Sequence, residues 1–435
     1  MKIRFSNLVF LLSFLMLWNF PTEAQESNEL NYGKAPDEFI PYGRFQDAYK
    51  WFFADPQLFL GPGREKVAPT DLETVRVGFL GPLEGSNIKN LGLQMLNGTT
   101  MAIEEANAKG GYHGIPFELM VHNDVGMWGA AANEVVKLDD EGVWGFLGSI
   151  DGIVTHVALR VALKLEIPLV NTADPDPTLT ETRIPWMIRT IGDDRQNSYA
   201  LALKIFKEMK LSRVAVLRTN YRYGRVGIME FREAARRLGY PLVLEVRYDE
   251  GESEFTTQLE RIRNTNPDAI MLWGNARETG MIVKQIRKMG MKQPIFGGDR
   301  LVSDSFLEIA GKDAEGVISV YPYNPEGDDP KLVAFTKDYE SRFGIKPDSF
   351  AAHAYDGMNI LLDAIQIAGL NRTKIRDVLT DLKTFQGYEG VTGKVVFDAS
   401  WNDIGSVYMA EVKNGKFIFY PSPMDDKKMT GSIKK

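Results

Sequence analysis

The sequence contains no cysteine among its 435 residues. A disulfide framework, a thiolate metal site and a cysteine nucleophile are therefore excluded. The absence also removes the residue that bacterial lipoproteins require at their cleavage site, so the mature chain is expected to diffuse freely. Histidine is scarce too. The four histidines lack metal-ligand spacing and are interpreted as structural: His113, His122, His156 and His353.

Only one long apolar run is present, from Leu8 to Phe20, and the basic residues Lys2 and Arg4 precede it. At about 13 residues it is shorter than the ~20 that a helix needs to span a bilayer. A basic start, an apolar run and the small residues Thr22 and Ala24 form the pattern of a secretory signal peptide. We expect cleavage near Ala24 and export to a periplasm, with a permanent membrane anchor as the alternative interpretation.

Residues 1–24 are then the signal peptide, and the mature chain has 411 residues (435 − 24). That length exceeds one hydrophobic core and fits about two domains plus an extension. No later stretch is apolar enough to span a membrane, so no stable membrane insertion is expected after cleavage. The formal net charge of −7 includes no large basic excess, which argues against nucleic acid as a partner.

Sequence motifs for catalysis and cofactor binding are missing. The first strand-to-helix loop, Gly81-Pro-Leu-Glu-Gly-Ser-Asn, lacks the G-x-G-x-x-G spacing of a dinucleotide site. No phosphate-binding loop follows a predicted strand, and no G-x-S-x-G nucleophile motif occurs. We expect no cofactor, no metal ion and no enzymatic activity, although the many carboxylates keep an acid–base pair open as an alternative.

Residues 25–70 are rich in proline, glycine and aromatic residues and show no sustained periodicity. Disordered segments are usually poor in aromatic residues, so this N-terminal extension is expected to pack on the first domain. From Thr74 short β-rich runs alternate with amphipathic helical segments, which is typical of βαβ units and a parallel sheet. The first predicted strands are 75–80, 117–122, 143–147 and 167–171, with helices at 91–108, 130–140 and 153–165.

A second series of the same kind begins after Gly192. Its predicted strands are 213–217, 242–246, 269–273 and 294–296, and its helices are 197–208, 226–238, 255–265 and 279–289. Helices at 331–343, 350–368 and 373–382 and a β-rich tail at 393–420 follow. The predicted fold is α/β, with two Rossmann-like doubly wound lobes joined by a hinge of three crossovers. Lobe 1 is expected to comprise residues 71–192 and 322–392, and lobe 2 residues 193–321 and 393–435.

Polar residues gather where the predicted strands of the first lobe end. In open α/β sheets, ligands bind outside the carboxyl ends of the strands. The candidate ligand contacts here are Ser149 and Asp151 after the third strand, and Thr172, Ala173 and Asp174 after the fourth. Ser149 has an alternative interpretation as a helix cap, because serine is favoured at that position. Asp176 could equally cap the segment that follows it.

Three loops of the second lobe place aromatic or charged side chains at the corresponding sheet edge. They span residues 220–224, 273–277 and 297–300. The candidate ligand contacts here are Tyr223, Trp273, Asn275, Asp299 and Arg300. Convergent polar and aromatic groups at a domain interface are the default hypothesis for a binding site. The sequence therefore predicts one ligand site with a face from each lobe.

The chain from about Val75 to Tyr420 resembles the type I periplasmic binding proteins, specifically the leucine/isoleucine/valine-binding-protein-like family that serves branched-chain amino acid ABC transporters. The resemblance rests on the order and spacing of short segments: Val77-Gly-Phe-Leu-Gly-Pro, Ala106-Asn-Ala-Lys-Gly-Gly, Gly145-Phe-Leu-Gly-Ser, Pro177-Thr-Leu-Thr, Tyr223-Gly-Arg-Val-Gly, Gly297-Gly-Asp and Tyr355-Asp-Gly. It implies two Rossmann-like lobes, joined by three strands, that close on a ligand. It does not cover residues 26–70.

The resemblance also implies roles for particular residues. In the amino-acid binders of that family, a serine after the third strand and a threonine after the fourth help to hold the carboxylate and ammonium of the ligand. Ser149 matches the serine, whereas the threonine position falls on or beside Pro175, which has no hydroxyl. Tyr223 matches a family tyrosine, and Asp299 matches the acidic residue that receives the ammonium.

Other positions depart from the family pattern. A further family tyrosine falls on Ala276, while Asp174, Arg277 and Arg300 add charge. The pocket is therefore predicted to be more polar than a pocket for leucine. We expect a polar or charged ligand, such as an amino acid, an amide or a small organic acid.

The resemblance implies an extracytoplasmic solute-binding receptor that delivers its ligand to the permease of an ABC transporter. One alternative is a sensory or partner-activating periplasmic binding protein. Another is a periplasmic enzyme on the same fold, since fold does not dictate function. A eukaryotic receptor ectodomain is disfavoured by the missing cysteine and the missing membrane span.

Overall fold

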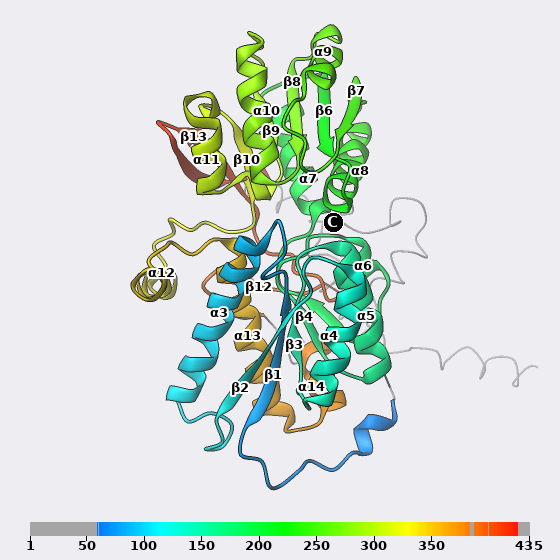
Figure 1. The fold of residues 1–435 in the computed structure, drawn as a ribbon, viewed down its shortest axis with the longest axis vertical. Coiled ribbons are helices and arrows are strands. Elements are labelled where there is room, and N and C mark those ends of the chain that lie inside the picture. The colour runs from blue at the N-terminus through cyan, green and yellow to red at the C-terminus, as the bar shows by residue number, and fades with distance from the viewer. Residues whose placement is uncertain (1–58, 60, 383–386, 399, 425–435) are drawn as a thin grey trace, which may run out of the picture.

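The computed structural model describes residues 59, 61–382, 387–398 and 400–424. The predicted signal peptide and all but the end of the predicted extension lie outside these residues. Figure 1 shows two α/β lobes stacked along the long axis of the molecule. The two-lobed α/β fold predicted from the sequence is confirmed.

The first lobe is built on a five-stranded parallel sheet in the order β2-β1-β3-β4-β5. The strands are β1 (Val75–Gly81), β2 (Phe117–Asn123), β3 (Phe146–Leu147), β4 (Leu169–Asn171) and β5 (Met187–Arg189). The helices are α3 (Lys89–Ala108), α4 (Trp128–Asp140), α5 (Gly152–Leu165), α6 (Thr178–Glu181), α13 (Ser349–Ala368) and α14 (Arg372–Thr380).

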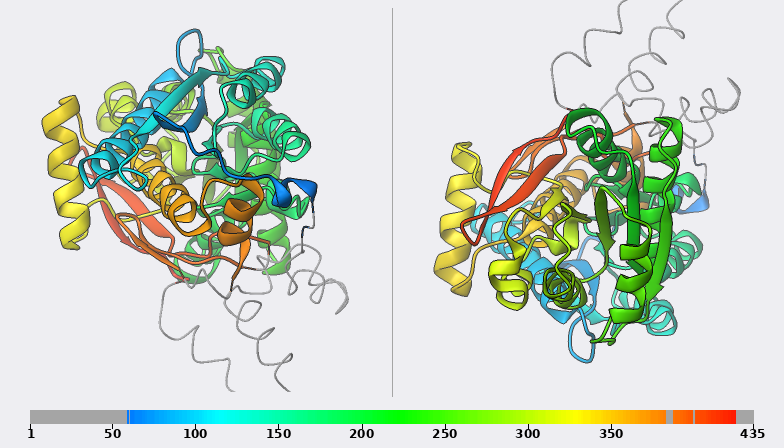
Figure 2. Two further views of the ribbon diagram at one scale, coloured as in Figure 1. Left: turned by 90° about the horizontal axis from the view of Figure 1, so that it is seen from below. Right: turned by 90° about the horizontal axis from the view of Figure 1, so that it is seen from above.

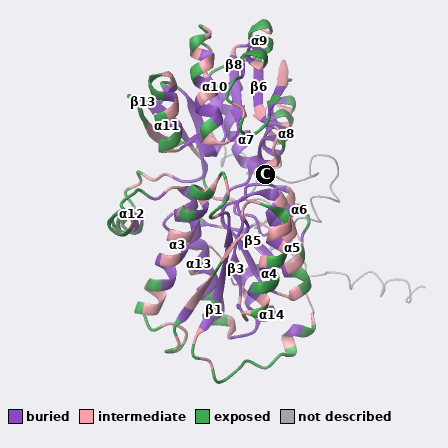
Figure 3. Cartoon of the chain, viewed as in Figure 1, coloured by how far each residue is buried: buried purple, intermediate pink, exposed green. Residues whose placement is uncertain are grey.

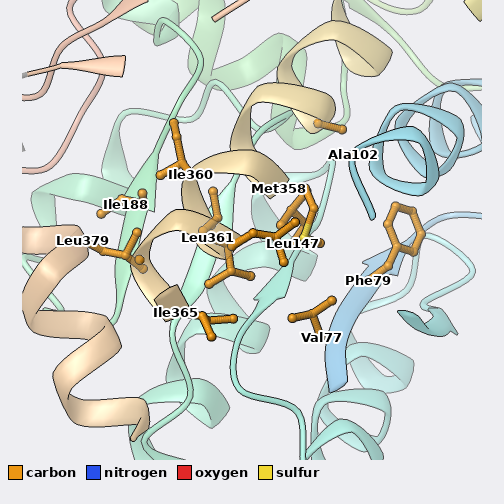
Figure 4. Close-up of a cluster of buried hydrophobic side chains, with 14 of the residues drawn as sticks. Val77, Phe79, Ala102, Leu147, Ile188, Met358, Ile360, Leu361, Ile365 and Leu379 are labelled. Atoms are coloured by element: carbon orange, nitrogen blue, oxygen red, sulfur yellow. The ribbon is translucent and has the colours of Figure 1, made fainter. Parts of the chain in front are cut away.

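Both faces of this sheet are covered by helices. Phe146 belongs to the apolar cluster that includes α4 and α5, whereas its neighbour Leu147 belongs to the cluster that includes α13. Figure 4 shows the second cluster, with Val77 and Leu147 from the sheet beside Met358 and Leu361 from α13. Burial on both faces explains why these strands are continuous apolar runs in the sequence.

The second lobe contains a seven-stranded sheet in the order β14-β13-β10-β9-β8-β6-β7. The strands are β6 (Val214–Thr219), β7 (Leu244–Tyr248), β8 (Ala269–Trp273), β9 (Ile295–Gly297), β10 (Ile318–Tyr321), β13 (Tyr408–Lys413) and β14 (Lys416–Pro421). The helices are α7 (Asp194–Ala202), α8 (Arg222–Arg237), α9 (Thr256–Asn264), α10 (Ala276–Lys288) and α11 (Asp304–Ala310). Strands β6 to β10 are parallel, and β13 and β14 add an antiparallel edge. Figure 3 shows the strands of both lobes buried beneath helices whose outer faces are exposed.

The described chain passes between the two sheets three times. The first passage joins β5 to α7, and the second joins β10 to α12 (Pro330–Phe343). The third follows a hairpin of β11 (Tyr388–Gly390) and β12 (Gly393–Val395) and leads to β13. Helix α12 lies to one side of both lobes (Figure 2). Three crossovers form a hinge, as the sequence predicted.

The last crossing comes later in the chain than the expected lobe boundary between residues 392 and 393. That boundary falls inside the hairpin, where Tyr388 pairs with Val395. Val395 and Trp401 both belong to the apolar core of the first lobe, and Trp401 Nε1 donates to the Thr380 carbonyl at 3.1 Å. These side chains hold the segment on the first lobe, so the chain leaves it only after Trp401.

The described end of the extension packs on the first lobe. It forms a short 3-10 helix, Pro62–Glu65, beside α14. The side-chain amide of Asn371 donates to the carbonyls of Gly63 and Lys66, each at 3.0 Å. Arg64 also pairs with Asp377 of α14. Phe59, an aromatic residue of the extension, packs with its ring centre 5.1 Å from that of Trp186 in the first lobe. The other aromatic residues of the extension lie outside the described residues.

Candidate functional site

The loops after the parallel strands of the two lobes face each other at the junction between the lobes. Side chains from β3 and β4 of the first lobe meet side chains from β6, β8 and β9 of the second, and nearly all of them are buried. The sequence predicted this meeting of strand ends. All ten predicted site residues lie at the ends of these strands or in the loop or first helical turn that follows: Ser149, Asp151, Thr172, Ala173, Asp174, Tyr223, Trp273, Asn275, Asp299 and Arg300.

Ser149 follows β3 and is 1% exposed. Its hydroxyl donates to Asp124 Oδ2 at 2.5 Å, and burial raises the pKa of Asp124 to about 6. The alternative interpretation of Ser149 as a helix cap is wrong, because α5 has Asp151 at its N-cap position. Asp151 makes no capping hydrogen bond with its side chain. Its carboxylate is thus available to the other lobe.

The loop after β4 is shaped by the side chain of Asn171. Asn171 Oδ1 accepts from the amides of Ala173 and Asp174 at 3.2 and 2.9 Å, and Nδ2 donates to the Asp174 carbonyl at 3.0 Å. This turn holds Thr172 and Asp174 in the junction, both almost fully buried. Thr172 Oγ1 and Asp174 Oδ2 have no hydrogen-bond partner among the residues described. Polar atoms buried without a partner are uncommon and are expected to bind a ligand or water.

Asp174 and Asp176 interact strongly within this loop. Asp174 Oδ1 accepts from the Asp176 amide at 3.1 Å. Burial, and then the charge of Asp176, raise the pKa of Asp174 to about 8. Asp176 Oδ1 accepts from the amide and hydroxyl of Thr178 at 3.0 and 2.7 Å, although the N-cap position of α6 is occupied by Pro177. Asp174 therefore carries the uncompensated carboxyl of this loop.

On the second lobe, Tyr223 lies at the centre of the candidate residues. Its hydroxyl donates to Asp299 Oδ1 at 2.5 Å, and the guanidinium of Arg300 lies 3.9 Å from its ring centre. The ring of Trp273 packs 6.0 Å from that of Tyr223, and Trp273 Nε1 has no partner among the described residues. Burial raises the pKa of Asp299. The two aromatic rings therefore pack beside the buried carboxyl of Asp299 and the buried guanidinium of Arg300.

Arg300 connects the two lobes. Nη2 donates to Asp151 Oδ1 and to the Ile150 carbonyl, both at 3.1 Å, and Nη1 donates to Asn275 Oδ1 at 3.2 Å. Arg300 Nε is buried and has no partner within the described part of the chain. The guanidinium is therefore held by three protein groups and its charge is balanced by Asp151.

A second ion pair across the junction was not among the predicted contacts. Arg222, in the first turn of α8, donates from Nε to Asp176 Oδ2 at 2.6 Å and from Nη2 to Thr178 Oγ1 at 2.8 Å. Arg222 lies in the loop 220–224, where the sequence predicts Tyr223 as the ligand contact. Arg277, expected to make the pocket more polar, is exposed and pairs with the adjacent Glu278 at 3.2 Å.

Asp194 is a further buried residue at this junction, and the sequence did not indicate it as a candidate. Asp193 and Gln196 form a capping box that starts α7, and this places Asp194 in the first turn, where it is 1% exposed. Its amide donates to the Pro175 carbonyl at 2.8 Å, so it lies against the loop that carries Asp174. Burial, and then the charge of Asp299, raise the pKa of Asp194 well above its ordinary value.

The arrangement can bind a small polar molecule between two lobes. No group of three or more acidic or histidine side chains within the described ranges is placed to hold a metal ion. Likewise, no helix in those ranges is both long and apolar enough to cross a bilayer.

Comparison with known proteins agrees with this geometry. A family model described as periplasmic binding protein matches residues 74–416. The Leu/Ile/Val-binding protein homolog 2 of Brucella abortus is 26% identical over 357 residues, which cover 81% of this chain and 94% of that protein.

Solved structures show the same similarity. A leucine binding protein of Thermotoga maritima has a TM-score of 0.74 and 27% identity, covering 81% of this chain and all of that one. A branched-chain amino acid transporter substrate binding protein of Streptococcus pneumoniae, solved in complex with isoleucine, has a TM-score of 0.74 and 25% identity. That comparison covers 80% of this chain and 99% of the Streptococcus chain.

Proposed function

Because this chain belongs to the periplasmic binding protein family and is a solute-binding receptor, we propose that it closes on a small polar ligand outside the cytoplasm and delivers it to an ABC transporter permease. Amino acids, amides and small organic acids form the first range of ligands to consider. Export through a cleaved signal peptide, with cleavage near Ala24, belongs to the same proposal. The protein is proposed to bind its ligand without chemical conversion.

The observation that carries this proposal is the contact of Arg300 with Asp151 beside unpartnered buried polar atoms. The two charged residues come from different lobes and lie 3.1 Å apart. Asp174 Oδ2 and Thr172 Oγ1 are buried at the same junction without partners among the described residues. A ligand that satisfies them stabilises the closed arrangement, because it binds the closed form better than the open form.

The site residues are proposed to divide by lobe. Ser149, Asp151, Thr172, Ala173 and Asp174 form the face of the first lobe, and Tyr223, Trp273, Asn275, Asp299 and Arg300 form the face of the second. Asp194, the first residue of α7 at the end of the first crossover, is proposed as a further member of this set. Hinge closure brings the two faces together around the ligand.

A thermal-shift screen of the purified protein tests the proposal, with amino acids, amides, carboxylates and amines as candidate ligands. A ligand at about 100 times its dissociation constant adds ~2.7 kcal/mol to the free energy of unfolding. The shift should disappear in Asp299→Ala and in Ser149→Ala, and it should persist in Arg236→Ala, whose side chain is 61% exposed on α8. A shift that survives both site variants would place binding elsewhere.

Two further measurements separate transport from its alternatives. Recovery of the bound molecule unchanged after prolonged incubation is expected of a receptor, whereas a converted product would indicate an enzyme. Ligand-dependent binding to a permease reconstituted in vesicles is expected of a transport receptor. Closure on a ligand without any permease binding would favour the sensory alternative.

A further inference from the structure

The junction between the lobes contains more buried carboxyl groups than cations. Asp151 is paired with Arg300, and Asp176 is paired with Arg222. Four other buried carboxyls have no Lys, Arg or His ion-pair partner within the described residues: Asp124, Asp174, Asp194 and Asp299. A buried carboxylate without a counter-ion is strongly unfavourable, so these groups require protons or a cation.

Three of these carboxyls belong to chain segments that meet at the junction between the lobes. The amide of Asp194 donates to the carbonyl of Pro175, the residue after Asp174. Asp299 is close enough to Asp194 for its charge to raise the pKa of that carboxyl. Asp174 comes from the first lobe, Asp194 from the first crossover and Asp299 from the second lobe. Closure of the hinge therefore determines how closely they approach.

Unpartnered acceptors mark this place as a ligand site. Asp174 Oδ2 has no hydrogen-bond partner in the described structure, and the residue is 2% exposed. Asn197 Oδ1 is likewise without a partner, on a residue that is 1% exposed and whose Nδ2 lies 3.5 Å from Asp194 Oδ1. Both are acceptors that an N–H donor of a ligand would satisfy.

The part of the junction next to Asp174, Asp194 and Asp299 is a poor place for a ligand carboxylate. The hydroxyl of Ser149 already donates to Asp124, and Pro175 has neither a hydroxyl nor an amide hydrogen. Both Nη atoms of Arg300 are engaged by protein acceptors, which leaves Nε as its one unpartnered nitrogen in the described structure. A carboxylate near Asp174 would face like charges, whereas an ammonium would face opposite ones.

We propose that the ligand is a small organic dication with two protonated nitrogens and no carboxylate, of which one nitrogen binds Asp174 and the other binds Asp194 and Asp299. This inference rests on the proposed function and names the chemical class of its ligand. The unpartnered acceptor of Asp174 determines the first position, and the pair of acids from the crossover and the second lobe determines the second.

Cadaverine and lysine form a matched pair for the test, because they differ only in the α-carboxylate. Isothermal titration of the protein should give at least tenfold tighter binding for cadaverine than for lysine, and tighter binding for cadaverine than for n-pentylamine, which lacks the second nitrogen. Putrescine and 1,3-diaminopropane vary the spacing of the charges. Tighter binding of lysine or of n-pentylamine than of every diamine would overturn the inference.

Single substitutions test whether diamine binding depends on the carboxyls of Asp174 and Asp194. Asp174→Asn and Asp194→Asn should each weaken diamine binding at least tenfold, whereas Asp338→Asn, a matched change at a side chain 43% exposed on α12, should leave it unchanged. Mass spectrometry of the ligand released from the denatured wild-type protein requires no variant and should detect a diamine. Release of a neutral or acidic molecule instead would contradict the inference.

The outcomes separate this inference from the proposed function. If leucine or another neutral amino acid binds, and this binding depends on Asp299, the inference of a dicationic ligand is contradicted while the proposed receptor function stands. Failure of every amine, amino acid, amide and carboxylate to bind would contradict both.

Discussion

Arg300 Nη2 of the second lobe lies 3.1 Å from Asp151 Oδ1 of the first, so a buried cation of one lobe neutralises a buried anion of the other. The same guanidinium stacks on Tyr223, whose hydroxyl is bound to Asp299. The side chain of Arg300 therefore links closure of the lobes to the orientation of Asp299.

Arg300→Lys is expected to weaken ligand binding by at least about tenfold. Lysine keeps the charge but cannot reach Asp151, the Ile150 carbonyl and Asn275 together, and each hydrogen bond to a charged group contributes about 1.5–3 kcal/mol. Isothermal titration measures the affinity, and small-angle scattering with saturating ligand measures closure. Unchanged affinity and compaction would show that the three contacts are not needed for closure.

The ion pair of Arg222 and Asp176 is expected to contribute to ligand affinity rather than to the stability of either lobe. In a double-mutant cycle of Arg222→Ala and Asp176→Asn, we expect a coupling of about 0.5–3 kcal/mol in ligand affinity. The physical reason is that the 2.6 Å contact forms only when the lobes meet. Additive effects of the two changes would mean that the contact contributes nothing to closure.

Arg189 is expected to be essential for stability. The residue is fully buried beside the first and third crossovers, where it donates to Asn402 Oδ1 at 2.7 Å and to Asp193 Oδ2 at 3.1 Å. Arg189→Met leaves Asp193 buried without its partner, which should cost about 3–5 kcal/mol in the free energy of unfolding. Denaturant unfolding measures this, and Arg236→Met, at an exposed position, should change it by less than about 0.5 kcal/mol. Similar losses for both variants would contradict the assignment.

His353 should make the protein less stable in acid. Burial lowers its pKa to about 4 from an ordinary value of 6.5, so the unfolded chain binds a proton more readily than the folded chain. Stability from this residue is therefore complete above pH 6.5 and is lost as the pH falls from 6.5 to 4, by up to about 3 kcal/mol. Buried carboxyls with raised pKa values, such as Asp348 at about 7, act in the opposite direction.

The comparison with His353→Gln isolates the histidine, because the carboxyls are present in both proteins. The free energy of unfolding of the wild type relative to this variant should fall between pH 6.5 and 4 and stay constant above pH 7. Parallel pH profiles of the two proteins would show that His353 is not the titrating group.

Periodicity predicted the long elements of the fold and the short strands β3, β4 and β9, but it missed other short strands. Strand 269–273 was predicted with its observed bounds, whereas β5 and β10, with three and four residues, were not recognised as strands. Such short strands are determined by pairing with neighbours, for instance Met187 with Leu169. The predicted helix 197–208 begins earlier, at Asp194, and its second half is a π-helix, Leu203–Glu208.

The sequence predicted which loops carry the candidate site residues better than it predicted which side chains contact each other. It predicted the loops after β3, β4, β6, β8 and β9 because ligand sites of open sheets lie at the ends of strands. It did not predict Asp194, which lies on a crossover, or the pairing of Arg222 with Asp176, which are 46 residues apart. Sequence order alone does not show which charged side chains of the two lobes form ion pairs across the junction.

The end of the extension is fixed to one lobe only. Asn371 and Asp377 hold residues 63–66 against α14, which Figure 1 places at the end of the first lobe away from the second. Residues 63–66 therefore move together with the first lobe. Rotation of the second lobe about the hinge can then leave these contacts unbroken.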